Sequence, residues 1–179
     1  MAVDGRTVSL RMPQAQPDRV GFLADVHGLA LGVFGTLRRG AAMALLPRFE
    51  AAAVAASLAR GATMLFGVPT MYARLRDSGR LPELAHLRLL VSGSAPLDPV
   101  LFDAVRRETG QAPVERYGMS ETVMLASNPV RGERKAGAVG LPLPGVSIRL
   151  GEGDGVEVNG PNVFRGYWER PDANATAFT

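Results

Sequence analysis

The feature of this sequence that most constrains its fold is a regular alternation of short apolar segments with longer segments that carry helix signals. Three apolar segments are each expected to form a buried strand, at residues 42–46, 64–68 and 87–91. Helix signals occupy the stretches around them, at residues 27–40, 50–61, 69–79 and 98–110. In the last of these, Asp98 supplies an N-cap, Pro99 the first helical position and Gly110 the stop. This alternation predicts βαβ units, and so an α/β fold with a mostly parallel sheet and flanking helices.

The composition of the chain changes after Gly118, where Gly and Pro become more frequent. In this portion, strands with alternating exposure are expected at residues 146–150 and 156–158. Earlier in the chain, two further short strands are expected, at residues 8–12 and 113–116. We therefore predict one partial domain over residues 1–179, with an α/β sheet unit at about 21–118 and a smaller β-rich C-terminal portion at about 119–179.

The composition excludes several classes of protein. Apolar residues make up 46% and charged residues 21% of the chain, which is typical of a folded soluble domain and not of a disordered one. The absence of cysteine excludes disulfides, thiolate metal sites and cysteine nucleophiles. The net charge is +3, but arginines alternate with acids and form no basic run, so we expect no nucleic-acid partner. No secretory signal or membrane-spanning apolar run is present, so we expect a cytoplasmic protein with no membrane association.

The first candidate ligand site follows the apolar segment 87–91, where residues 92–97 read SGSAPL. In an open parallel sheet, ligands bind beyond the carboxyl ends of the strands. Small residues at such a position let a flat ring or a phosphate approach the backbone closely. A nucleotide could therefore lie here. The same hexapeptide also fits a plain strand-to-helix turn, and on this segment alone that alternative stays open.

The second candidate site is the YGMSE segment at residues 117–121, directly after the short predicted strand 113–116. An adenine ring needs a flat partner such as Tyr117, and a phosphate accepts a hydrogen bond from a hydroxyl such as that of Ser120. Mg²⁺ carried by a triphosphate needs a hard oxygen such as the carboxylate of Glu121. Taken singly, Tyr117 also fits a half-buried core tyrosine and Glu121 a solvated acid.

Together, the two segments resemble the AMP-forming acyl-CoA synthetases, in which a turn of the SGSAPL type lines the adenine site and a YGxTE segment follows one crossover later. By that resemblance, five residues line the adenine nucleotide: Gly93, Ser94, Ala95, Tyr117 and Gly118. Ser120 stands at the threonine position that contacts the phosphate, and Glu121 holds Mg²⁺. Both of these residues are thereby expected to be catalytic. Serine keeps the hydroxyl of threonine, so this departure from the pattern is mild.

Other stretches resemble the malonyl-CoA synthetase branch of this family, and the similarity covers about residues 21–179. The resemblance implies a small carboxylate substrate, malonate or methylmalonate, with ATP, Mg²⁺ and CoA as cofactors. Malonate is a dianion, so its second carboxylate needs a cation, and Arg116 could form a bidentate pair with it. His27 could add a hydrogen bond. The alternatives are a surface ion pair between Arg116 and Glu115 or another acid, and a helix-start role for His27.

Two parts of the family pattern do not occur within these residues. No Ser/Thr/Gly-rich phosphate loop ending in Pro-Lys-Gly lies upstream of His27, and no match to the small domain with the catalytic lysine is found. We therefore expect a partial ligase that on its own does not complete acyl-CoA formation. The alternative is a non-catalytic remnant that binds a nucleotide or a partner. We also expect an exposed sheet edge, which favours self-association or a complementing chain.

Overall fold

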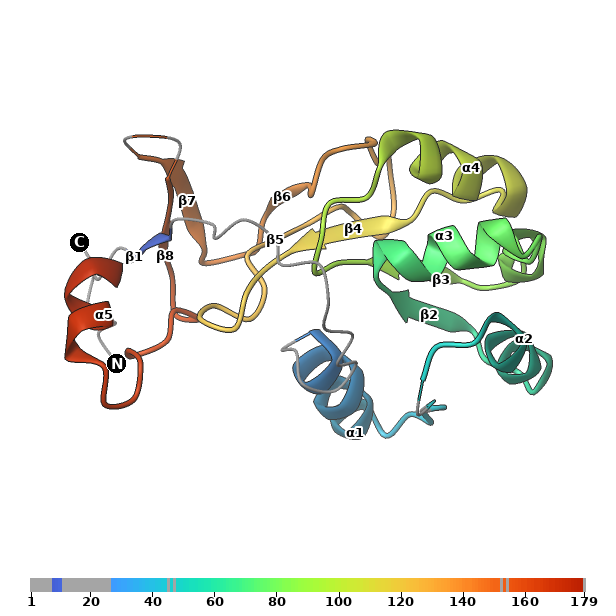
Figure 1. The fold of residues 1–179 in the computed structure, drawn as a ribbon, viewed down its shortest axis with the longest axis horizontal. Helices are drawn as coiled ribbons and strands as arrows, with labels where there is room; N and C mark the ends of the chain where they lie inside the picture. Colours follow the sequence, from blue (N-terminus) through green and yellow to red (C-terminus); the bar gives the residue numbers. More distant parts are fainter. Residues whose placement is uncertain are drawn as a thin grey trace.

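The computed structural model describes residues 8–10, 27–44, 46, 48–151, 153 and 155–178, and for residues 8–10 and 27 it describes the backbone only. The described chain forms an α/β unit around one sheet and a second, smaller sheet apart from it (Figure 1). The larger sheet has five strands in the order β2-β3-β4-β5-β6, and the smaller has three in the order β1-β8-β7.

The larger sheet begins with three parallel strands, as the alternating pattern predicts. They are β2 (Met64–Gly67), β3 (Leu89–Ser92) and β4 (Val114–Tyr117). Two short antiparallel strands extend it, namely β5 (Ala126–Ser127) and β6 (Leu141–Pro142). The predicted α/β class with a mostly parallel sheet is confirmed. Because β5 and β6 follow Gly118, part of the C-terminal half joins this sheet, and the predicted division near residue 118 stays a prediction.

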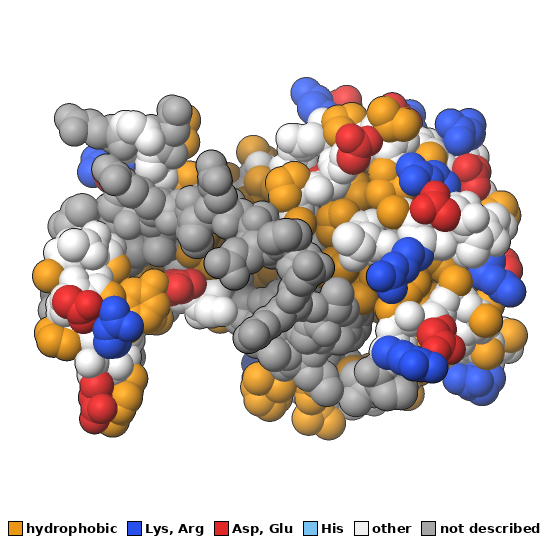
Figure 2. Space-filling view, in the orientation of Figure 1, with side chains coloured by type: hydrophobic (Ala, Val, Ile, Leu, Met, Phe, Trp, Pro, Cys, Tyr) orange, Lys and Arg blue, Asp and Glu red, His pale blue; other side chains and the backbone are white. Residues whose placement is uncertain are grey.

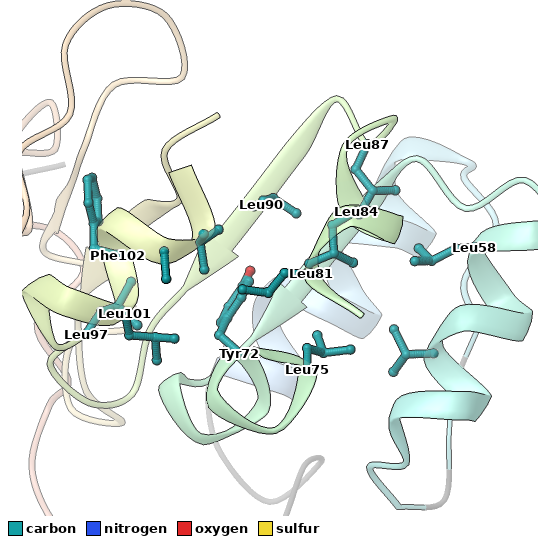
Figure 3. Close-up of a cluster of buried hydrophobic side chains, with 13 residues drawn as sticks. Leu58, Tyr72, Leu75, Leu81, Leu84, Leu87, Leu90, Leu97, Leu101 and Phe102 are labelled. Carbon is teal, nitrogen blue, oxygen red and sulfur yellow. The ribbon is translucent and has the colours of Figure 1, made fainter. Parts of the chain in front are cut away.

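Helices cover one face of these parallel strands and form the main core. They are α2 (Ala51–Ala59), α3 (Pro69–Asp77), the 3₁₀ turn η2 (Leu81–Leu84) and α4 (Pro99–Thr109). Figure 3 shows the side chains of this core converging from the helices onto Leu90 of β3. The hydroxyl of Tyr72 lies within this core and donates to the carbonyl of Val91 at 2.8 Å, which ties α3 to β3.

The residues predicted to begin and end the helix at 98–110 cap α4 in the structure. The carboxylate of Asp98 accepts hydrogen bonds from the amides of Val100 and Leu101, at 2.8 and 3.2 Å. Gly110 ends α4 with φ 75°, a left-handed conformation that glycine adopts without a steric cost. The helix predicted at 27–40 is also confirmed and consists of a π-helical segment, η1 (His27–Phe34), followed by α1 (Gly35–Arg39).

One predicted strand is wrong. Residues 41–44 and 46 form no strand, residue 45 lies outside the described residues, and residues 41–44 are exposed. A short apolar run cannot be assigned to a strand by composition alone, because buried helix segments have the same composition. Within the described residues β2 is the outermost strand of the sheet, so residues 41–44 and 46 do not extend it.

The smaller sheet is antiparallel. It consists of β1 (Val8–Leu10), β8 (Val156–Asn159) and β7 (Ser147–Leu150), close to the three strands predicted there. A helix that the sequence analysis did not predict, α5 (Pro171–Ala177), follows it. None of the described helices combines the length and apolarity needed to cross a bilayer. Figure 2 shows basic and acidic side chains intermixed on the visible face of the α/β unit, in agreement with the alternating charges of the sequence.

Candidate functional site

The two candidate segments leave the sheet side by side. β3 and β4 are parallel neighbours, with Ser92 opposite Glu115 in their register. The chain that follows each strand therefore emerges at the same edge of the sheet, where ligands of open parallel sheets bind. The amide of Gly93 donates to the carbonyl of Gly67 at 3.3 Å, so the end of β2 also borders this edge.

The first turn presents small residues at this edge. Gly93 is buried, whereas Ser94 and Ala95 are exposed. Ser94 has φ 67°, a left-handed conformation that is uncommon for a residue with a side chain and that recurs at ligand sites. The end of this segment is tied to β4, because Oε2 of Glu115 accepts from the amide of Leu97 at 3.3 Å.

The second turn, residues 118–124, doubles back on itself. A Cβ added to Gly118 would lie 2.0 Å from the carbonyl oxygen of Val123, so only glycine fits there. The amide of Leu125 donates to the carbonyl of Tyr117 at 2.9 Å and closes the turn. Tyr117 is half-buried, and burial raises the pKa of its phenol. Ser120, in the same turn, is exposed.

Glu121 is half-buried in the same turn, and its Oε1 accepts from the hydroxyl of Tyr167 at 2.8 Å. The described part of the chain has no group of three or more His, Cys, Asp or Glu side chains that could hold a metal ion. A single carboxylate fits Mg²⁺ that arrives with a nucleotide, because Mg²⁺ in such sites takes most of its ligands from phosphate and water. The Glu121 carboxylate is an oxygen ligand of the kind that Mg²⁺ prefers.

Arg116 has an unusual environment. Its Nε atom is buried and has no hydrogen-bond partner, and its Cζ lies 5.5 Å from the centroid of the Phe66 ring. Burial lowers the pKa of its guanidinium. Consecutive strand residues point to opposite faces, and Glu115 bonds Leu97 on the other face of the sheet. Among the ion pairs of the described residues, none includes Arg116, so the ion pair with Glu115 considered above is not found.

The structure brings most of the predicted site residues to one edge of the sheet. The turns after β3 and β4 hold Gly93, Ser94, Ala95, Gly118, Ser120 and Glu121, and the last two residues of β4 are Arg116 and Tyr117. The side chain of His27 lies outside the described residues, so its role stays a prediction. Sequence reasoning missed Glu115 and Tyr167, which contact the two turns. An acid inside a predicted strand was the available signal for Glu115, whereas Tyr167 gave none.

Comparison with known proteins identifies the family. The family model for AMP-binding enzymes matches residues 8–168. The chain belongs to the AMP-binding enzyme family. It is 34% identical over 203 residues to the mitochondrial malonate–CoA ligase of Mus musculus, an alignment that covers 88% of this chain and 35% of that protein.

Solved structures agree with this assignment. A malonyl-CoA ligase in a product complex with methylmalonyl-CoA and AMP superimposes with a TM-score of 0.77 at 45% identity, over 87% of this chain and 38% of that one. The ATP-bound MatB of Rhodopseudomonas palustris gives a TM-score of 0.80 at 41% identity, over 87% and 34% of the two chains. The chain thus spans about a third of the length of the relatives it matches.

Proposed function

We propose that this chain supplies the nucleotide and carboxylate sites of an ATP-dependent acyl-CoA ligase that activates malonate or a close analogue such as methylmalonate. The proposal is supported by the family, by the turns that meet at one sheet edge, and by relatives whose names are malonate–CoA and malonyl-CoA ligase. In the proposed reaction, a substrate carboxylate oxygen attacks the α-phosphorus of ATP, pyrophosphate leaves, and the thiol of CoA then displaces AMP from the acyl-AMP.

The residues of the two turns have distinct roles in this proposal. The small residues Gly93, Ser94 and Ala95 allow the adenine to approach the backbone, and the ring of Tyr117 stacks on it. The hydroxyl of Ser120 donates to a phosphate oxygen. The carboxylate of Glu121 binds the Mg²⁺ of the nucleotide, which, when bound, neutralises charge on the phosphates. Gly118 allows the tight turn that presents Ser120 and Glu121 together.

The observation that carries the choice of malonate is the buried, unpartnered Nε of Arg116. An unpaired buried donor of a charged group is costly, so such a group is retained where a ligand pairs with it. A guanidinium suits a carboxylate because it donates two parallel hydrogen bonds. A monocarboxylate would leave this donor unpaired, whereas the distal carboxylate of malonate would satisfy it.

Binding of malonate and propionate to the chain with Mg²⁺ and AMP tests this proposal. We expect malonate to bind at least tenfold more tightly than propionate, and Arg116→Met to remove that difference, since a charged hydrogen bond contributes about 1.5–3 kcal/mol. Arg88→Met, a change on a strand-flanking arginine outside the turns, is the matched control and should keep the preference. Equal affinities for both acids in the unaltered chain would contradict the malonate assignment.

We further propose that these 179 residues bind nucleotide without completing the reaction, since they span about a third of the relatives' length. The second candidate function is a non-catalytic nucleotide- or partner-binding protein derived from such an enzyme. Release of pyrophosphate that depends on both malonate and ATP would refute the first statement. Failure to bind any adenine nucleotide would favour a partner-binding role.

A complementing chain or a second copy is proposed to cover the outer edge of β2. Support comes from the position of β2 as the outermost strand among the described residues and from exposed apolar side chains in the segment that precedes α2, at Leu29, Phe34, Leu37 and Met43. Sedimentation at several concentrations tests the self-association part. A monodisperse monomer at all concentrations would rule out the second copy as the occupant.

A further inference from the structure

A distant segment of the chain holds the backbone of the turn that carries Glu121. Nδ2 of Asn162 donates to two carbonyls of this turn, those of Thr122 at 2.6 Å and Met124 at 2.9 Å. The amide of Phe164 donates to the carbonyl of Glu121 itself at 2.7 Å. Three backbone carbonyls of one turn are therefore satisfied by residues some forty positions later in the chain, as the separations of 38 and 40 residues for Asn162 show.

The same segment also holds the Glu121 side chain. The hydroxyl of Tyr167 donates to Oε1 of Glu121 at 2.8 Å. The Tyr167 side chain is half-buried, so this bond is partly shielded from water. Only Oε1 takes part in it, and Oε2 stays outside the bond. A carboxylate held by one oxygen keeps its second oxygen as a ligand for a cation.

Tyr167 is itself fixed from two sides. Its amide donates to Oδ1 of Asn174 at 2.7 Å, and Nδ2 of Asn174 donates back to its carbonyl at 3.0 Å, which anchors the residue to α5. Its ring packs edge-on against Phe164 at 4.8 Å between centroids, and Phe164 stacks on Phe178 at 5.4 Å. The hydroxyl thus has a defined position relative to the turn.

We propose that Tyr167 is a positioning residue for Glu121, which orients this carboxylate so that it meets the Mg²⁺ of a bound nucleotide in one fixed geometry. The inference rests on the proposed function, because it assumes that Glu121 contacts nucleotide-borne Mg²⁺. It makes α5 and the aromatic cluster around Phe164 part of the support of the nucleotide site. In this role Tyr167 acts through Glu121 and does not contact the nucleotide.

Two measurements on Tyr167→Phe test the proposal, since this change removes the hydroxyl and keeps the ring contacts. The first is the affinity for ATP with Mg²⁺ and with EDTA. We expect the Kd for Mg²⁺·ATP to rise about tenfold and the Kd for metal-free ATP to stay unchanged, because a hydrogen bond to a charged group is lost while the adenine contacts remain. Tyr72→Phe is the matched control, since it removes a hydroxyl that donates to Val91 in the core, and it should leave the Mg²⁺ dependence intact.

The second measurement is a double-mutant cycle of urea unfolding with Tyr167→Phe, Glu121→Met and both changes together, since methionine lacks the oxygen that accepts from the Tyr167 hydroxyl. We expect the two changes to be non-additive. Additive effects would show that the side chains do not interact and would overturn the proposal whatever the nucleotide affinity. Non-additive effects with an unchanged Mg²⁺·ATP affinity in Tyr167→Phe would also overturn it, since the contact would then be structural only.

The Mg²⁺ dependence of ATP binding in Glu121→Gln and in Tyr167→Phe distinguishes failure of this inference from failure of the proposed function. If the unaltered chain and Glu121→Gln bind ATP equally well with and without Mg²⁺, Glu121 does not contact the cation, and both proposals fail. If Glu121→Gln loses the Mg²⁺ dependence while Tyr167→Phe retains it fully, the proposed function stands and the positioning role of Tyr167 is refuted.

Discussion

Gly118→Ala tests whether the close backbone approach at the second turn sets the shape of the nucleotide site. A Cβ at this position would lie 2.0 Å from the carbonyl oxygen of Val123 and 3.0 Å from Cα of Met124. Real Cβ contacts with backbone atoms do not fall below 3.0 Å, so the turn must open by about 1 Å. Because both contacts are backbone atoms, no side chain can rotate away to relieve them.

The expected cost follows from that displacement. Overpacking of this kind destabilises by about 1–3 kcal/mol, which for a chain of this size lowers the Tm by roughly 2–4 °C per kcal/mol. Opening the turn also moves Ser120 and Glu121, so the Kd for Mg²⁺·ATP should rise at least tenfold. Thermal unfolding and titration calorimetry measure the two effects.

A glycine with free space provides the control. Among the described residues, no heavy atom beyond the helix's own backbone and the chain neighbours lies within 4 Å of a Cβ added to Gly32, and its φ is not positive. Gly32→Ala should therefore leave both the Tm and the nucleotide affinity close to those of the unaltered chain. If Gly118→Ala has the same Tm and the same Kd for Mg²⁺·ATP as Gly32→Ala, the backbone of Val123 does not approach Gly118 as closely as described.

The remaining predictions concern the support of the site. Burial raises the pKa of Glu115 above its ordinary value of 4.5, against the opposing hydrogen bonds from Leu97 and Gly137, so the folded state holds this proton more tightly than the unfolded state. The contribution of Glu115 to the free energy of unfolding should therefore fall as pH rises from 4.5 to the raised folded pKa. Urea unfolding between pH 4.5 and 8 measures this pH dependence, and Glu115→Gln should remove it. An unchanged pH dependence in Glu115→Gln would refute this prediction. Leu90→Ala removes a fully buried core side chain and should cost about 2–5 kcal/mol in the same assay, and a cost below about 1 kcal/mol would contradict the core described here.

The fold was predictable where local signals and packing agree. The cap at Asp98, the left-handed Gly110 and the apolar strands beside α3 and α4 all act locally, and the structure has them where the pattern placed them. The strand predicted at 42–46 was wrong because a short apolar run does not distinguish a strand from other structure, and residues 41–44 are exposed. The short strands β5 and β6 were missed because two residues carry no periodicity.

The site was predictable in part, for a similar reason. Tyr117, Ser120 and Glu121 are contiguous in sequence, so their juxtaposition needed only the exit of one strand. The pairing of that exit with Gly93–Ala95 followed from the parallel arrangement of β3 and β4. The contact between Tyr167 and Glu121 joins residues 46 positions apart in sequence, and no local pattern encodes it.

An adenine nucleotide is expected to bind at the edge where β3 and β4 end. Amide chemical-shift mapping of the 19.0 kDa chain during titration with Mg²⁺·ATP would locate the bound nucleotide. We expect the largest shifts on Gly93 to Ala95 and on Tyr117 to Glu121, with little change in β7. Shifts centred away from both turns, or none at millimolar nucleotide, would contradict it.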